Sequence, residues 1–290
     1  MYITRLMAVG MQRLGNAILT LHFDHYIVPR PHKTIILTCL PVDYVQTVLS
    51  TYFPDRDNIE VVADQVLESQ YPDIESWRDP RQERGTWLKQ QALKLSAIDC
   101  FESDVFLIHD PDTFCIRPYQ YINNDQLNLF AMSDTSHSQG YYAVIENALA
   151  IDRQTTACFV SEIMPVFKTD WVNCKQRIET TTQQPWLLGL IENVPLEAFG
   201  RYRQVKWFSE YELLGNWTMY SRTVDFTEQQ RFQFNKSVDE LAQVDNNYNC
   251  VCDQGPNGHI KGPASLFELD RNFGITNLQP ALEILHRKLS

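Results

Sequence analysis

Apolar and polar positions near the start of the chain follow two patterns, one typical of a strand and one typical of a helix. Residues 34–38 form an apolar, β-branched run typical of a buried strand, residues 43–52 carry apolar side chains at helical intervals, and residues 58–62 read as a second strand. A strand, a helix and a strand within about 30 residues make a parallel crossover unit. We therefore expect an α/β, Rossmann-like fold, with a mixed, mainly parallel sheet flanked by helices.

The first predicted strand leaves a long segment before it. We expect residues 1–33 to be an extension packed on one domain formed by residues 34–290. No internal repeat, low-complexity tract or long linker divides that domain.

The segment from residue 86 to residue 118 combines a helix pattern with a strand pattern. Residues 86–98 have an apolar stripe at i, i+4, i+7 and i+10, which predicts an amphipathic helix. Residues 105–108 (VFLI) form a short apolar run bounded by polar residues, which predicts a buried strand. Asp110 and Asp112 stand where that strand should end, and ligands of open α/β sheets bind at the carboxyl ends of strands.

Two carboxylates one residue apart can chelate a hard divalent cation. Mg²⁺ or Mn²⁺ is commonly held by one or two carboxylates together with substrate phosphates. Asp110 and Asp112 therefore point to a sugar transferase that uses a nucleotide-sugar donor, and the alternative is a turn without metal. The second D-x-D triplet, Asp55 to Asp57, lies between predicted elements after a proline and is interpreted as a solvated turn.

The second half of the chain gives a weaker pattern. Residues 128–132 resemble a strand, and residues 141–150 a helix or a strand. We expect residues 158–190 to form helical pieces broken at Pro165 and Pro185, because proline interrupts a helix.

Length and composition indicate an ordered globular protein. The 290 residues are 44% hydrophobic, and no run approaches the 18 apolar residues of a membrane span. The segment at the N-terminus, interrupted by Arg5 and Arg13, lacks the pattern of a signal peptide. Seven scattered cysteines without a C-x-x-C pair suit reduced thiols, so we expect a cytoplasmic protein, in a host cytoplasm if it is viral.

Charge and cysteine spacing bear on two further classes of site. The net charge of −11 disfavours a surface built to bind nucleic acid, although a local basic groove is compatible with it. Cys250, Cys252 and His259 could be imagined as zinc ligands, but C-x-C is a poor spacing and a fourth ligand is missing.

Several polar residues are placed to contact a nucleotide. Thr38 and Asp64 follow predicted strands and could touch a base or ribose, or they could be cap and turn residues. Cationic residues gather before the aspartate pair, where they could neutralise a diphosphate or form a solvated helix face. The donor-binding candidates in and beside this helix are Arg84, Lys89, Gln90 and Lys94.

A second dense group of aromatic and acidic residues spans 206–217 (KWFSEYELLGNW). Ring faces contact sugars and carboxylates accept their hydroxyl protons, so this segment is typical of a carbohydrate site. Glu210 is a candidate for acceptor binding or for the general base. Glu212 is a weaker candidate, because Ser209 and Glu212 also fit a helix capping box. Asp134, after the strand at 128–132, is a candidate for sugar hydroxyls.

The two blocks together carry a resemblance. TWLKQQALKLSAID…VFLIHDPDTFCIRP followed by WFSEYELLGNW resembles a poorly characterised family of GT-A-type glycosyltransferases. The resemblance covers about residues 34–220 and implies a single GT-A domain, a nucleotide-sugar donor and a Mn²⁺ or Mg²⁺ ion held by Asp110 and Asp112. His109 and Leu214 depart from the family pattern, which has an apolar and an aromatic residue there.

Related GT-A enzymes complete the metal site with a histidine near the C-terminus. Residues 258–263 (GHIKGP) resemble that segment in residue types, with a histidine, a lysine, glycines and a proline, though not in spacing. By that resemblance His259 is a candidate third metal ligand and Lys261 a candidate diphosphate contact, and both side chains suit a site that gains negative charge. The alternative is a glycine-rich surface loop.

The sequence thus predicts a metal-dependent hexosyl- or pentosyltransferase that moves a sugar, from a UDP-sugar in the first instance, to a hydroxyl of a glycan or polysaccharide. One alternative acceptor is a hydroxymethylated base of viral DNA. Alternatives of other classes are a nucleotide-sugar hydrolase or phosphotransferase and a non-catalytic sugar-binding module. Inversion or retention at the anomeric carbon depends on carboxylate separations that a sequence does not give.

Overall fold

The computed structural model of the chain contains two compact units. Met1–Thr4, Asp64–Ile108 and Asn123–Glu228 form the first unit, and Arg5–Ala63, His109–Ile122 and Gln229–Ser290 form the second. The structure describes residues 1–10, 13–77, 85–132, 140–199, 202–206, 208–234, 237–253, 275 and 277–289.

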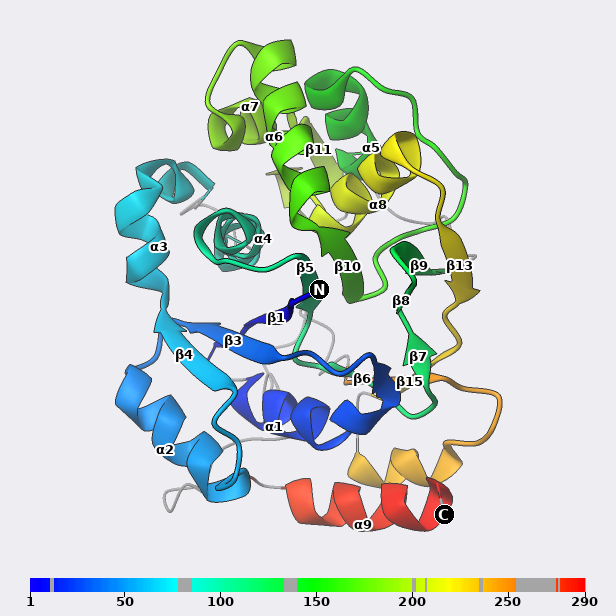
Figure 1. Cartoon of the computed structure of the whole chain (residues 1–290). Coiled ribbons are helices and arrows are strands. Elements are labelled where there is room, and N and C mark those ends of the chain that lie inside the picture. The colour runs from blue at the N-terminus through cyan, green and yellow to red at the C-terminus, as the bar shows by residue number, and fades with distance from the viewer. Residues whose placement is uncertain are drawn as a thin grey trace. The chain divides into compact units, whose positions relative to one another are not determined.

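A five-stranded sheet runs in the order β10-β5-β1-β3-β4 (Figure 1). β3 and β4 are parallel, with Thr34 opposite Ile59 and Thr38 opposite Ala63. The fold is α/β, with a mostly parallel sheet flanked by helices, which confirms the predicted fold class. The strands of this sheet are β1 (Ile3–Ala8), β3 (Lys33–Thr38), β4 (Ile59–Ala63), β5 (Val105–His109) and β10 (Ile163–Phe167).

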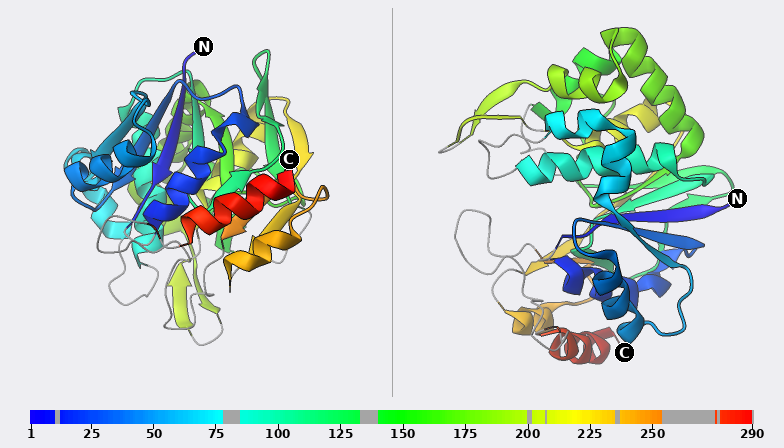
Figure 2. Two further views of the ribbon diagram at one scale, coloured as in Figure 1. Left: turned by 90° about the horizontal axis from the view of Figure 1, so that it is seen from below. Right: turned by 90° about the vertical axis from the view of Figure 1, so that its left-hand side faces the viewer.

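Helices of the second unit pack through apolar side chains, on one face of the helix or all round it. α2 (Val42–Tyr52) packs on β4 through a face that includes Val45, Val48 and Leu49. α1 (Leu14–His22) packs on β6 (Thr113–Cys115), and its residues Leu14 to Leu21 are all buried. α9 (Leu278–Leu289) lies against η5 (Val238–Gln243), as Figure 2 shows.

Short strands complete the second unit. β15 pairs with β14 in parallel and with β6 in antiparallel orientation, and β2 pairs with β7 in parallel. Through these pairings, strands from distant parts of the sequence lie beside β6 and β7, which follow β5 in the chain. Their bounds are Ile27–Val28 for β2, Tyr119–Gln120 for β7, Arg231–Phe234 for β14 and Cys250–Asp253 for β15, with η2 at Asp24–Tyr26.

The first unit is mainly helical. α4 packs on α3, on η3 and on α6, while α8 packs on α5, α6 and β10. α7 packs against α6. It begins directly after Pro185, and proline is tolerated at a helix start because the N–H that it lacks would have no partner within the helix. The helices are α3 (Asp64–Gln70), η3 (Pro72–Trp77), α4 (Gly85–Cys100), α5 (Gly140–Val144), η4 (Ile145–Leu149), α6 (Lys168–Thr182), α7 (Trp186–Asn193) and α8 (Glu210–Ser221).

The remaining strands form two small sheets. β9 pairs in parallel with β13, while β11 and β12 form an antiparallel pair. No helix of the described residues is long and apolar enough to cross a membrane. The strands are β8 (Ile122–Asn123), β9 (Gln126–Ala131), β11 (Leu196–Phe199), β12 (Tyr202–Lys206) and β13 (Asp225–Glu228).

Two expectations about the elements differ from the structure. The sheet begins at Ile3, so residues 1–33 contribute β1 and α1 rather than a separate extension. Residues 163–167 form strand β10, not a helical piece. β10 is an edge strand, and Pro165 is tolerated there because an edge strand can lack one hydrogen-bond donor.

Candidate functional site

The carboxylate pair lies in the turn that links β5 to β6. The run Val105–Ile108 is completely buried, and burial decreases at Asp110 and Asp112, which are both partly exposed. Pro111 stops the strand, and the Thr113 N–H donates to the Asp110 carbonyl across the turn at 3.4 Å. The two predicted metal ligands are therefore at the carboxyl end of a buried strand, in the place that the sequence indicates.

Two hydrogen bonds from neighbouring elements hold this turn, and a third closes it from within. The Thr20 hydroxyl of α1 donates to the Pro111 carbonyl at 2.6 Å, and the Asp253 N–H of β15 donates to the Asp112 carbonyl at 2.9 Å. The buried His109 ring lies 2.6 Å from the Thr113 carbonyl through Nε2. These bonds use backbone atoms of the turn, so they hold the backbone that carries Asp110 and Asp112 and do not involve their carboxylate oxygens.

His109 is a neutral support of the turn. Burial, and then the positive charge of Arg5, lower the pKa of His109 to about 3. Since Thr113 offers a carbonyl, Nε2 is the protonated nitrogen and donates to it. The polar residue that departs from the family pattern at this position thus closes the turn rather than facing a ligand.

A polar cluster surrounds Asp112 within the second unit. The Arg13 Nη1 atom lies 3.2 Å from Asp112 Oδ2 and donates to the Asp253 carbonyl at 3.2 Å. The Asn16 amide of α1 donates to Asp253 Oδ2 at 2.9 Å, so Asp253, although buried, is compensated. Arg13, Asn16 and Asp253 were not among the predicted site residues. One signal was present, because Asp253 follows the apolar run Cys250–Cys252 as Asp110 follows Val105–Ile108.

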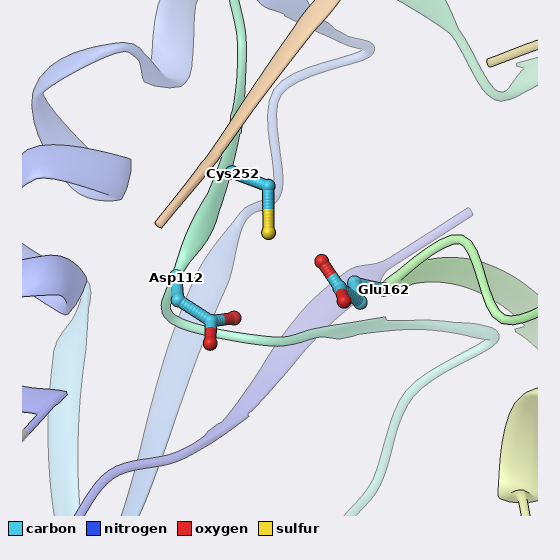
Figure 3. A group of neighbouring side chains, drawn as sticks. All are labelled: Asp112, Glu162 and Cys252. Atoms are coloured by element: carbon cyan, nitrogen blue, oxygen red, sulfur yellow. The ribbon is translucent and has the colours of Figure 1, made fainter. Parts of the chain in front are cut away.

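The chemistry of this turn suits a divalent cation. Asp112 and Cys252 each bring a ligand atom within 4.8 Å of the other, and Figure 3 shows both side chains; Glu162, also drawn there, belongs to the first unit. Carboxylate oxygens prefer Mg²⁺ or Mn²⁺, and a thiol favours softer ions. Asp110 is not part of the described group of ligand atoms that includes Asp112 and Cys252. The seven cysteines are free thiols.

The predicted donor-binding residues of the first unit lie on α3 and α4. Lys89 is paired with Glu68 at 2.6 Å and with Glu75 at 3.4 Å. Asp64 begins α3, and burial raises its pKa to about 6 while Lys89 opposes the rise. Gln90 is partly exposed on α4. A raised carboxyl pKa in a polar setting is typical of functional positions, and it is equally compatible with a structural pair.

Lys94 and Glu210, predicted on the donor and acceptor sides, form one buried ion pair. Their side chains are 4% and 1% exposed, and Lys94 Nζ also lies 5.0 Å from the centre of the Tyr211 ring. The Glu210 N–H donates to the Gln91 side chain at 2.9 Å. These contacts connect α4 to α8, so the two charges are neutralised by each other inside the unit.

Glu212 fixes a neighbouring segment. It is fully buried, accepts from the Phe159 N–H at 3.0 Å and from the Asn216 amide at 3.2 Å, and burial raises its pKa. Ser209 caps α8 by accepting from the Glu212 N–H at 3.3 Å, so half of the predicted capping box is present. The Glu212 carboxylate contacts residue 159 instead of returning to Ser209.

The aromatic side chains of this segment are core residues. Phe208, Tyr211 and Trp217 are 0%, 3% and 6% exposed, and the Trp217 indole donates to the Asp170 carbonyl at 2.8 Å. Ring faces that contact a sugar must be accessible, so the described rings of this block stabilise the fold rather than form a carbohydrate surface.

The other candidates are distributed as follows. Thr38 is buried, donates to the Val9 carbonyl at 2.8 Å and accepts from the Leu40 N–H at 3.1 Å, which is the role of a strand-end cap. The candidates that lie outside the described residues are Arg84, Asp134, His259 and Lys261.

Comparison with solved structures defines the fold class. The galactosyltransferase LgtC, solved with donor and acceptor sugar analogs, matches 99% of this chain and 96% of its own with 11% identity and a TM-score of 0.50. The bifunctional glycosyltransferase WbbM matches with 11% identity and a TM-score of 0.50 over 99% of this chain and 50% of its own, so the chain spans about half of WbbM. Mouse xyloside xylosyltransferase 1 has 8% identity and a TM-score of 0.49 over 87% of this chain and 98% of its own.

The similarity to LgtC and WbbM establishes the GT-A fold of glycosyltransferase structures for the chain. The chain belongs to DUF6492, a family of unknown function, whose model matches residues 8–249. No curated protein matches the sequence.

Proposed function

We propose that this protein is a metal-dependent glycosyltransferase that moves a sugar from a nucleotide-sugar donor to a hydroxyl of a glycan. The observation that carries the proposal is the turn at residues 110–112. There, two aspartates follow a buried strand in a turn whose backbone is held by hydrogen bonds, in a chain with the GT-A fold.

In this proposal Asp110 and Asp112 hold Mn²⁺ or Mg²⁺. The ion, when bound, would stabilise the negative charge that develops on the departing nucleoside diphosphate. The protein's own contribution is to hold the backbone that carries both carboxylates through Thr20, His109 and the Asp253 N–H, which would limit the reorganisation that accompanies metal binding. A UDP-sugar is the first donor to test, and His259 and Lys261 remain predicted additions to the site.

Glu210 has a narrower role than the sequence suggests. Its pairing with buried Lys94 gives it a counter-charge that a general base would have to give up. We therefore propose that Glu210 and Lys94 position α8 against α4, and we assign no base to this chain from the described residues.

Isothermal titration calorimetry tests the proposal directly. UDP, GDP, CDP and dTDP are titrated with and without Mn²⁺ into the wild-type protein and into Asp110→Asn/Asp112→Asn. We expect one diphosphate to bind in the presence of Mn²⁺ and its affinity to fall at least about 100-fold in the double variant, because carboxylate oxygens are the ligands of hard divalent cations.

The chain supplies a matched control in its other D-x-D triplet. Asp55 and Asp57 are exposed in the loop after α2, and the variant Asp55→Asn/Asp57→Asn removes the same charge. Its diphosphate affinity should equal that of the wild type. If both double variants bind alike, or if no nucleotide binds at millimolar concentration, the metal-dependent transferase proposal is wrong.

A further inference from the structure

Arg13 lies between β1 and α1 and contacts the proposed metal-binding turn. Its Nη1 atom lies 3.2 Å from Asp112 Oδ2 and donates to the Asp253 carbonyl at 3.2 Å. The Arg13 side chain is 28% exposed and that of Asp112 is 20% exposed, so the pair is accessible from solvent. The pair brings together residues from opposite parts of the sequence, in one unit.

We propose that Arg13 binds the diphosphate of the donor, beside the cation held by Asp110 and Asp112. This inference rests on the proposed function, because it assigns a second charge to the same site. A carboxylate has two oxygens with about four lone-pair positions, so Asp112 can contact the guanidinium and a metal ion together. A cation on Asp112 would then lie close to Arg13. The oxygens of a diphosphate bound to that cation would be within reach of the guanidinium.

Charge supports the same assignment. Two aspartates already offset a divalent cation, so a diphosphate that binds to this ion needs a further positive charge. Arginine is suited to this task because its planar donors match phosphate oxygens in pairs. Within the described part of the cluster around Asp112, Arg13 is the cationic side chain.

A backbone hydrogen bond holds Arg13 directly before α1. The Arg13 N–H donates to the Gly10 carbonyl at 3.0 Å, and the side chain does not cap α1. The acceptor of its other bond, the Asp253 carbonyl, belongs to a buried residue that Asn16 also holds. The guanidinium is thus presented from a preorganised position, which reduces the entropic cost of binding a ligand.

The experiment compares ligands that differ only in phosphate. Arg13→Gln is titrated with the diphosphate that binds the wild type in the presence of Mn²⁺, with the corresponding nucleoside by ligand-observed NMR, and with Mn²⁺ alone. We expect diphosphate affinity to fall about 10- to 100-fold, since a charge-assisted hydrogen-bond pair is lost. Nucleoside affinity should stay within about twofold and Mn²⁺ affinity within about threefold, because the base and metal contacts are unchanged.

Two variants serve as controls. Arg117→Gln removes a partly exposed arginine of the same unit that donates to Asn246 and to the Ile116 carbonyl, and it should bind as the wild type does. Arg13→Lys keeps the charge without the paired donors, and should recover part of the lost affinity.

The results separate the two proposals. Unchanged diphosphate affinity in Arg13→Gln overturns the role of Arg13 while the metal-dependent binding of the wild type still supports the proposed function. Equal loss of diphosphate, nucleoside and Mn²⁺ binding also overturns it, since Arg13 would then only position Asp112. Absence of any nucleotide binding by the wild type overturns both.

Discussion

Asp64 shows how one residue can make stability depend on pH. It begins α3, where burial raises its carboxyl pKa from 3.8 to about 6, the nearby Lys89 opposes this rise, and Glu68 adds to it. In the unfolded chain the group ionises near its ordinary value. The folded protein therefore holds the Asp64 proton more tightly, and this contribution to stability is lost as pH rises from about 4 through about 6.

We predict that Asp64→Asn raises the free energy of unfolding above pH 7 relative to the wild type, and changes it little near pH 4. The expected gain is about 1 to 2 kcal/mol. This is less than the free energy that corresponds to the whole rise in the Asp64 pKa, because solvent screens a partly exposed group. Urea unfolding at pH 4, 6 and 8 measures it. Asp152→Asn, at an exposed position of the same unit, should show no such pH dependence, and a gain equal at all three pH values would contradict the prediction.

Single residues also explain why the start of the sheet was missed. Arg5 interrupts the apolar pattern of residues 3–8, yet its side chain is 0% exposed and paired with buried Asp24. Burial alone would raise the pKa of Asp24, but Arg5 and Arg56 outweigh it and leave that pKa lowered. A charge inside a strand is tolerated only with such a partner. Because Asp24 follows on another element, the hydrophobic pattern by itself excluded a strand that the ion pair permits.

At the scale of elements, α8 depends on one close contact. Gly215 faces Phe159, and a Cβ atom at position 215 would lie 2.4 Å from its Cγ atom. Phe159 itself is held by the bond from its N–H to Glu212 of the same helix. The glycine of the FSEYELLG block therefore allows α8 to approach the segment at residue 159.

We predict that Gly215→Ala destabilises the protein by about 1 to 3 kcal/mol, since overpacking a fixed ring exceeds the gain of about 1 kcal/mol in helix propensity. Thermal and urea unfolding measure the change. Gly10→Ala is the matched control, because nothing lies within 4 Å of a Cβ atom at that position. Equal effects of the two substitutions would mean that the ring moves aside.

The buried Lys94–Glu210 pair joins α4 to α8 and invites a double-mutant cycle. Removing one partner leaves a charge buried without its counter-charge, so Lys94→Met and Glu210→Met should each cost about 3 to 5 kcal/mol. Lys94→Met/Glu210→Met should cost less than the sum, with a coupling of about 1 to 3 kcal/mol. The more exposed pair Lys89–Glu68 should couple by less than about 1 kcal/mol. Additive losses at Lys94 and Glu210 would contradict a paired state.

Elements with strong local patterns were predictable and those made by distant pairing were not. The strand at residues 34–38, the helix at 43–52 and the strand before Asp110 occur as β3, α2 and β5. β15 pairs with β6, where Cys250 lies opposite Cys115, more than 100 residues away in sequence. It also pairs with β14, where Cys250 lies opposite Arg231, 19 residues away. Such pairing leaves little trace in a local window. The contacts of Asp253 with Asp112 and Arg13 were therefore not foreseen, although the aspartate pair itself was.

For the molecule as a whole, the fold belongs to a class of transferase structures, and the acceptor distinguishes the alternatives. A net charge of −11 opposes the many phosphate contacts that binding to duplex DNA requires. The basic and aromatic segment at residues 201–207 (RYRQVKW) is the part of the sequence that is compatible with a DNA acceptor. Lys206, its described cation with a known partner, donates to the Ile191 carbonyl and thus serves the first unit internally.

We predict that the protein does not bind duplex DNA containing hydroxymethylated bases at 150 mM salt, whereas its Mn²⁺-dependent nucleotide binding persists there. Filter binding between 50 and 200 mM salt measures the first and calorimetry on the same preparation the second. A DNA acceptor would instead give an affinity that falls about 10³-fold or more over this range, because each neutralised phosphate releases counterions. A steep salt dependence of that kind would favour modified DNA as acceptor, and its absence together with nucleotide binding would leave a glycan hydroxyl as the acceptor to pursue.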